Sequence, residues 1–303
     1  MIVKESRRHH YIPQFILRNF CFDKENNLKY YDYINKSISI KNTKDIFMEK
    51  DLYRDEINHN DNPTEIEKSF SKYESEVSLI IKEIIVKKDI LLSVQDYNSL
   101  LLFFALLSFR SISASNQFSI NNTDYLQYCQ NNENVNDMWK RNLGHLTNCR
   151  SLDEVLKSPN IDEPIKIFMT RDIFGLFGKY IVVLERRGNE DFCLGDAYPC
   201  IITGGELNIT MYDYYPISPN KIILLASNGV DKVPDSVKIF KNSNLSKPIQ
   251  IGNKIKLHFT KIYNNEVESI NKAIISNSKI GICFKDESRV PSLFIDFNEK
   301  NFN

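Results

Sequence analysis

Residues 100–110 of this 303-residue chain read LLLFFALLSFR, and this stretch decides the fold. It is apolar on every side apart from Ser108, as expected of a helix that passes through a protein core. Ser93 suits the cap before that helix, and Asp96 suits its first turn, where a negative charge is favourable. The stretch ends in Arg110, a guanidinium that needs an acidic partner or a route to water beside so apolar a segment.

The helix predicted before it offers such a partner. From residue 64 onward, apolar side chains recur at alternating spacings of four and three, which predicts one continuous buried face. They are Ile66, Phe70, Tyr73, Val77, Ile80 and Ile84. Glu67 and Glu74 are seven positions apart, so they lie nearly in line along one edge of that face. We therefore expect one of these glutamates to pair with Arg110.

The N-terminal segment is dense in unusual residues. Residues 7–20 read RRHHYIPQFILRNF, and Pro13 suits the first turn of a short helix, where its missing N–H costs nothing. A β-hairpin is predicted next, with strands over 28–34 and 37–40 that are joined at Asn35–Lys36.

The spacing of the apolar residues changes in the second half of the chain. Residues 116–163 are weakly patterned apart from a predicted helix over 138–143. Beyond Pro164 the spacing of the apolar residues is typical of strands. The prolines within residues 215–219 are expected to interrupt a connection. The predicted strands are 165–169, 179–185, 192–194, 201–203 and 221–226. A last helix carries Asn271 and precedes a strand over 279–284.

These elements predict an α+β fold. It comprises an N-terminal helix and β-hairpin, a core of long α-helices, and a C-terminal mixed or antiparallel sheet with a late helix packed on it. We expect one integrated domain over residues 1–303, helix-rich over residues 1–163 and β-rich over residues 164–303, because nothing resembling a linker separates the two halves.

Charge and apolar runs exclude several classes of protein. Lysine plus arginine and aspartate plus glutamate number 39 each, which argues against a protein that coats DNA, although a local patch can still bind nucleic acid. The longest apolar run, 100–107, is too short to span a bilayer, and the start lacks the apolar core of a signal peptide. We expect a cytoplasmic protein with no membrane partner.

Six cysteines are present, with no close pair of the kind that binds zinc. Their neighbours are mostly apolar. We therefore expect buried free thiols in a reducing compartment and no disulfide framework.

Several motifs together resemble a bacterial family catalogued as domain of unknown function 4238. They lie at residues 9–20 (HHYIPQFILRNF), 28–34, 48–53 (MEKDLY), Glu67 and Glu74, 109–110, 194–199 (LGDAYP) and 269–271. Gly195 stands where the family pattern leads us to expect serine, and Ala197-Tyr198 replaces a single residue before the proline. The resemblance covers most of the chain but implies no agreed activity.

The resemblance nominates a set of polar candidates for a catalytic site: His9, His10, Glu67, Glu74, Arg110, Asp196 and Asn271. Histidine and carboxylate side chains are ligands for a divalent metal, here His10, Glu74 and Asp196. Arginines can then hold a phosphate. This interpretation predicts a metal-assisted hydrolase of nucleic acid or nucleotides, in the setting of a toxin or phage-defence effector.

A structural interpretation explains the same residues without catalysis. Glu67 and Glu74 are separated by about 10 Å along the helix axis, too far for ideal joint ligation of one metal. A buried ion pair between one of them and Arg110, with His10 closing the network, would be a polar clamp. Asp196 suits a turn residue before Pro199, and Asn271 suits a capping residue or one that forms a hydrogen bond across helices.

Other catalytic patterns are missing from the sequence. Gly204-Gly205 lacks the lysine of a phosphate-binding loop, and no serine sits in a Gly-x-Ser-x-Gly turn. The competing class is a non-enzymatic module that binds a protein or a small ligand. Its anchors would be the tyrosines at 30, 31, 33, 212, 214 and 215, which are also typical of sheet faces and cores.

Overall fold

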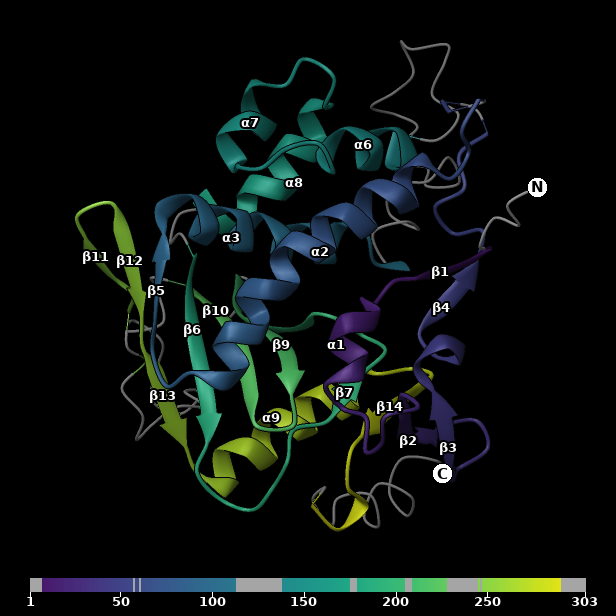
Figure 1. Ribbon diagram of the computed structural model, residues 1–303, viewed down its shortest axis with the longest axis vertical. Coiled ribbons are helices and arrows are strands. Elements are labelled where there is room, and N and C mark those ends of the chain that lie inside the picture. Colours follow the sequence, from purple (N-terminus) through teal and green to yellow (C-terminus); the bar gives the residue numbers. More distant parts are fainter. Residues whose placement is uncertain are drawn as a thin grey trace. The chain divides into compact units, whose positions relative to one another are not determined.

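The computed structural model describes residues 7–56, 58–59, 61–112, 138–174, 179–204, 209–227, 245 and 247–289 (Figure 1). The chain forms two compact units. Unit 1 comprises Met1–Tyr11, Phe47–Ile80 and Gln95–Gly175, and unit 2 comprises Ile12–Ile46, Ile81–Val94 and Leu176–Asn303. Helices and both antiparallel and mixed sheets are present, which confirms the α+β class. The two units interleave along the chain, so neither corresponds to the helix-rich stretch over residues 1–163 or the β-rich stretch over residues 164–303.

Unit 1 is built on helices. They are α2 (Glu65–Val86, whose last turns belong to unit 2), α3 (Val94–Phe109), α6 (Met138–Leu146), α7 (Leu152–Lys157) and α8 (Glu163–Phe174). Every side chain from Leu100 to Leu107 in α3 is buried, as its all-round apolar sequence predicts. The hydroxyl of Tyr73 on α2 donates a hydrogen bond to the Ser99 carbonyl on α3 at 2.8 Å. The two long helices therefore make contact within this unit.

A short β-ribbon completes unit 1. β1 (Arg8–His10) pairs antiparallel with β4 (Met48–Lys50), and His9 lies opposite Glu49. The Tyr11 N–H extends the ribbon by donating to the Phe47 carbonyl at 3.2 Å. This pairing places the two histidines beside the chain that leads into Tyr53.

The segment 165–169 is helical, so its prediction as a strand was wrong. It lies inside α8, where Ile165 and Met169 are buried and Ile167 is 63% exposed. In a strand these three side chains would share one face, whereas a spacing of four returns to the same face of a helix. The exposed middle residue therefore fits the helix.

The described residues of unit 2 form three sheets. The five-stranded sheet has the order β13 (Phe259–Ile262), β6 (Lys179–Arg186), β10 (Lys221–Ser227), β9 (Ile209–Ser218), β8 (Cys200–Gly204). β13 runs parallel to β6 and the other pairs are antiparallel, so the sheet is mixed as predicted. A second sheet has the order β3 (Ser37–Asn42), β2 (Asn27–Asp32), β14 (Gly281–Phe284), β7 (Leu194–Gly195), and a third has β11 (Ile249–Ile251), β12 (Lys254–Leu257), β5 (Ile90–Ser93).

The predicted hairpin is formed by β2 and β3, with a longer turn than expected. The Asp32 carboxylate accepts the N–H groups of Ile34 and Asn35 at 2.9 and 3.0 Å, and Lys36 adopts a φ of 48°. An aspartate that binds the backbone two and three residues ahead stabilises a turn. The connection therefore spans residues 33–36.

Strand β9 runs through Pro216, where the sequence led us to expect an interruption. Pro216 lies opposite Ile222, beside a register irregularity between Lys221 and Ile222. A proline has no N–H to donate and is tolerated where the ladder is irregular. The strand therefore continues across a residue that would interrupt a regular ladder.

Two helices and two 3-10 turns of the described residues also belong to unit 2. They are α1 (Gln14–Arg18), whose N-cap is Pro13, the 3-10 turns η1 (Thr43–Asp45) and η3 (Glu287–Arg289), and the late helix α9 (Asn264–Asn277). The Asn19 amide donates to the Ile217 carbonyl at 2.9 Å, so α1 is attached to β9.

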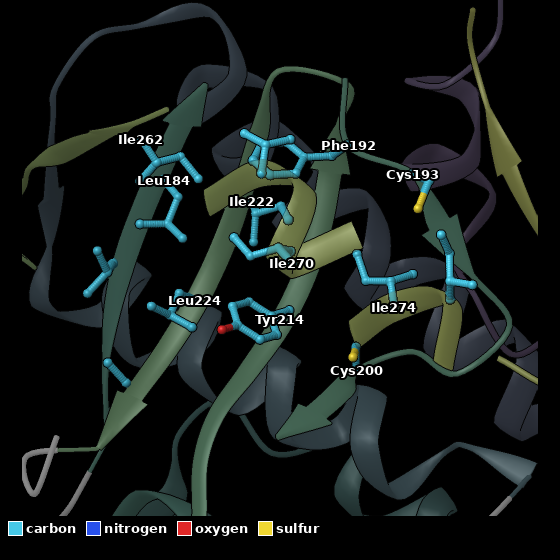
Figure 2. Packing of buried hydrophobic residues seen from close by; sticks show 14 of the residues in the cluster. Leu184, Phe192, Cys193, Cys200, Tyr214, Ile222, Leu224, Ile262, Ile270 and Ile274 are labelled. Atoms are coloured by element: carbon cyan, nitrogen blue, oxygen red, sulfur yellow. The ribbon is translucent and has the colours of Figure 1, made fainter. Parts of the chain in front are cut away.

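The core of unit 2 lies between the five-stranded sheet and α9. Figure 2 shows side chains of alternate strand residues, such as Leu184, Leu224 and Tyr214, directed toward Ile270 and Ile274 of the helix. All five are at most 1% exposed. Burying an aliphatic or aromatic side chain of this size contributes roughly 1.5–3 kcal/mol each, so this layer is a main source of stability.

Candidate functional site

Arg110 is the centre of a buried polar group in unit 1. It follows α3 directly, and it is 2% exposed. Nη1 donates to the Glu74 carboxylate of α2 at 2.5 Å, and Nη2 donates to the backbone carbonyl of His10. Nε donates to the Tyr53 hydroxyl at 3.2 Å, and the guanidinium lies over the Phe70 ring, 4.3 Å from its centroid. All three nitrogens are therefore bonded within the unit.

The predicted ion pair of Arg110 is confirmed, with Glu74 as the partner. Burial lowers the pKa of Arg110, but Tyr53 and the Glu74 carboxylate raise it, and the net pKa lies above its ordinary value. The guanidinium therefore stays charged although it is removed from water. A buried cation of this kind depends on its partners, because an uncompensated charge in the interior is costly.

Tyr53 connects the members of this group. Its hydroxyl donates to the Arg110 carbonyl at 3.1 Å, and its ring lies 5.8 Å from that of Trp139. Trp139 in turn donates its indole N–H to the Phe109 carbonyl at 2.8 Å. Burial raises the pKa of Tyr53 to about 12, so the phenol remains protonated. The candidate set from the sequence omitted Tyr53, although the motif at 48–53 ends in it.

The two adjacent histidines enter the group in different ways. His9 is fully buried, its Nδ1 accepts the backbone N–H of Tyr53 at 2.8 Å, and its ring stacks on the Tyr53 ring at 5.7 Å. His10 is 7% exposed and binds Arg110 through its backbone carbonyl. The predicted closing of the network by His10 thus occurs through its main chain. We call His9, His10, Tyr53, Glu67, Glu74 and Arg110 the Arg110 cluster.

Glu67 is a member of the Arg110 cluster with a buried carboxylate oxygen that the described hydrogen bonds do not use. It lies two turns before Glu74 on α2, and among the described residues its buried Oε2 has no hydrogen-bond partner. Burial raises the pKa of Glu67 to about 7, opposed by the charge of Arg110 and assisted by that of Glu74. The carboxyl group therefore changes its charge near neutral pH.

Asp196 lies in unit 2, directly after β7, and binds backbone. Its Oδ1 accepts the N–H groups of Lys279, Ile280 and Gly281 at 2.9, 3.1 and 3.3 Å. These residues connect α9 to β14. Asp196 therefore fixes the start of a central strand, a structural role that differs from the expected turn residue before Pro199.

Asn271 also lies in unit 2, fully buried on α9. Its Oδ1 accepts the Cys193 N–H at 3.1 Å, and its Nδ2 donates to the Asp191 carbonyl at 2.9 Å. The side chain thus satisfies one donor and one acceptor of an irregular segment before β7. The role is structural, but it is neither the capping nor the cross-helix hydrogen bond that the sequence led us to expect.

The metal set predicted from the sequence is divided between the two units, because His10 and Glu74 belong to unit 1 and Asp196 to unit 2. Within the described stretches of the chain, no three or more His, Cys, Asp or Glu side chains gather in a way that could hold a metal ion. A metal role of these three residues stays a prediction.

Two further expectations concern thiols and membranes. The described cysteines, at 21, 149, 193, 200 and 283, are free thiols, and all except Cys21 are buried. Cys129 lies outside the described residues. No described helix is long and apolar enough to cross a membrane.

Fold and cluster together define an α+β protein with a buried Arg–Glu–Tyr–His group in one of its units. The model of the family described as "Protein of unknown function (DUF4238)" matches residues 8–288, and the chain belongs to this family. Neither a curated protein nor a solved structure matches the chain.

Proposed function

We propose that the protein is a hydrolase of phosphodiester bonds in nucleic acid or nucleotides, in which Glu67 transfers the proton. The observation that carries the proposal is the buried Glu67 Oε2, which has no hydrogen-bond partner among the described residues. Arg110 and Glu74 satisfy one another, whereas this oxygen is not used by the described hydrogen bonds. A buried carboxyl group that the fold does not use is a candidate for chemistry.

The electrostatic setting of Glu67 supports this role. Burial raises the pKa of this carboxyl group to about 7. A general acid or base is most effective when its pKa lies near the working pH, because both protonation states are then populated. Glu67 would accept a proton from the attacking water or donate one to the leaving oxygen.

The metal-assisted form of the proposal adds a divalent ion, for which His10 and Glu74 of unit 1 are the candidate ligands. It requires Glu74 to exchange its bond with Arg110 for the ion, since the Glu74 carboxylate binds the guanidinium in this structure. An ion of this kind would activate water and neutralise phosphate charge. The biological setting we propose is a cytoplasmic bacterial toxin or phage-defence effector.

A second candidate is a non-enzymatic interaction protein in which the Arg110 cluster is a polar clamp. It is favoured by the complete internal bonding of Arg110 to Glu74, the His10 carbonyl and Tyr53. These bonds attach β1 to the helices of unit 1. In this alternative Glu67 serves only the packing around the clamp.

The test compares Glu67→Gln with Glu76→Gln, which changes a half-exposed glutamate on the same helix. Hydrolysis of single-stranded and double-stranded nucleic acid and of nucleotides is measured with and without divalent ions, from about pH 5 to about pH 9. We expect Glu67→Gln to lose about 100-fold or more in kcat, together with the pH limb near neutrality, because general acid–base groups contribute this much. The control keeps its activity.

Two results would overturn the proposal. One is a folded Glu67→Gln variant with unchanged kcat and an unchanged pH profile. The other is a wild-type protein with no activity on any of these substrates, which would leave the clamp as the function of the cluster.

A further inference from the structure

The hydrogen bond of His9 fixes where its proton lies. The Nδ1 atom accepts the backbone N–H of Tyr53 at 2.8 Å, so Nδ1 contributes a lone pair and carries no hydrogen. A neutral imidazole has one protonated and one unprotonated nitrogen. The proton of His9 therefore resides on Nε2.

The surroundings disfavour a second proton on this ring. Protonation of Nδ1 would place two donors against each other and break the bond to Tyr53. The geometry of this bond therefore excludes a hydrogen on Nδ1 while the bond persists.

The same bond bears on metal ligation. A histidine that binds a metal through Nε2 ordinarily donates its Nδ1–H to a carbonyl or carboxylate. In His9 this order is reversed, because Nδ1 accepts and Nε2 keeps the hydrogen. Neither nitrogen then offers a lone pair to a cation while the Tyr53 bond persists.

We propose that His9 is a neutral, Nε2-protonated positioning residue that holds Tyr53, and through it Arg110, and that it is neither the base nor a metal ligand. The chain of contacts is continuous, since His9 binds the Tyr53 main chain and the Tyr53 hydroxyl binds Arg110 through both its Nε and its carbonyl. The tautomer stands on this geometry alone. The role of His9 in a reaction rests on the proposed function, in which Glu67 and not His9 transfers the proton.

The tautomer is tested by nuclear magnetic resonance on the full chain with heavy-nitrogen-labelled histidine. We expect a pyridine-type shift for Nδ1 of His9, a pyrrole-type shift for Nε2, and a coupling between Nδ1 and the Tyr53 amide across their hydrogen bond. That coupling assigns the signal among the five histidines without any variant. A hydrogen on Nδ1, or on both nitrogens, would overturn the inference.

The positioning role is tested with His9→Asn and His9→Leu. The asparagine carbonyl takes the place of Nδ1 and can accept the Tyr53 N–H, whereas leucine cannot. We expect His9→Asn to keep the Tyr53 amide shift, a kcat within about 10-fold and the pH limb near neutrality, because it retains the acceptor and His9 moves no proton. His9→Leu should shift the Tyr53 amide and lose activity.

Loss of the pH limb in a folded His9→Asn variant would show that His9 is the base and would overturn the positioning role. Equal Tyr53 amide shifts and activities in the two variants would overturn it as well. If wild type hydrolyses none of the substrates, the proposed function fails, while the resonance experiment still decides the tautomer.

Discussion

The candidate residues of the two units bond in different ways. In unit 1 the Arg110 cluster combines two bonds between side chains, from Arg110 to Glu74 and to Tyr53, with bonds to the main chain of His10, Tyr53 and Arg110. In unit 2, Asp196 and Asn271 bond to main-chain groups, three N–H groups in one case and an N–H with a carbonyl in the other.

Main-chain groups must be satisfied wherever the chain is irregular, so Asp196 and Asn271 have roles that need no substrate. A buried ion pair does not by itself mark a site for chemistry, since Lys179 and Asp213 of unit 2 form one as well. We place the proposed function in the Arg110 cluster because Glu67 has a buried carboxylate oxygen without a hydrogen-bond partner among the described residues, and a pKa raised to about 7.

The largest effect expected is on Arg110. Replacing it in Arg110→Met leaves Glu74 without its cation and should lower the free energy of unfolding by about 3–5 kcal/mol. Urea unfolding followed by circular dichroism measures this. The double variant Arg110→Met with Glu74→Leu removes both charges and should recover at least half of the loss. A single-variant loss below about 1 kcal/mol would contradict a central role of the ion pair.

The next effect is on the stability contributed by Asn271 in unit 2. Asn271→Ala leaves the Cys193 N–H and the Asp191 carbonyl without this partner, and should cost roughly 2–4 kcal/mol, since each unsatisfied buried group costs about 1–3. Asn277→Ala, near the exposed end of the same helix, is the matched control and should stay within about 0.5 kcal/mol. Equal unfolding midpoints for both variants would contradict the anchoring role of Asn271.

The third effect depends on pH. The folded-state pKa of Glu67 is about 7, above its ordinary value of 4.5, so between these values the folded protein binds more protons than the unfolded chain. Stability from this group is therefore present below about pH 4.5, falls as pH rises toward 7, and is constant above. Glu67→Gln should be about 3 kcal/mol more stable than wild type above pH 7 and similar to it below pH 4.5. A pH-independent difference in urea unfolding would contradict the raised pKa.

The smallest effect belongs to a surface ion pair. Lys157 and Asp153 lie one turn apart on α7, with side chains that are 75% and 68% exposed. Lys157→Ala should change the free energy of unfolding by roughly 0.3–0.5 kcal/mol, because water and salt screen such pairs. A loss as large as that of Arg110→Met would remove the contrast between buried and exposed charges.

The sequence predicted the Arg110 pair because helical spacing is regular. Glu67 and Glu74 follow the apolar face of α2, and an arginine after an all-apolar helix must find an acid. It did not distinguish Glu74 as the partner, since one-dimensional spacing places both glutamates on the same edge. Tyr53 was missed because its bonds come from residues 44 and 57 positions away, which no local pattern encodes.

Local ambiguity accounts for the errors in the second half. Residues 165–169 alternate in a way that suits a strand, but Ile167 is exposed and the segment is a helix. Strand β9 passes through Pro216 because the ladder between β9 and β10 is irregular next to this residue, so the missing N–H of the proline is tolerated there. Both outcomes depend on neighbours in space, which spacing along the chain does not contain.

The pairing of β2 with β14 has a consequence for synthesis on the ribosome. Lys29 in β2 and Glu287 after β14 form an ion pair across 258 positions, so the hairpin is synthesised long before its neighbouring strand. At roughly 5–20 residues per second, that interval is on the order of 10 to 50 seconds. The segments of unit 1 end at Gly175, well before that strand is made. During this time the nascent hairpin presents an open strand edge, and such an edge can pair with another chain.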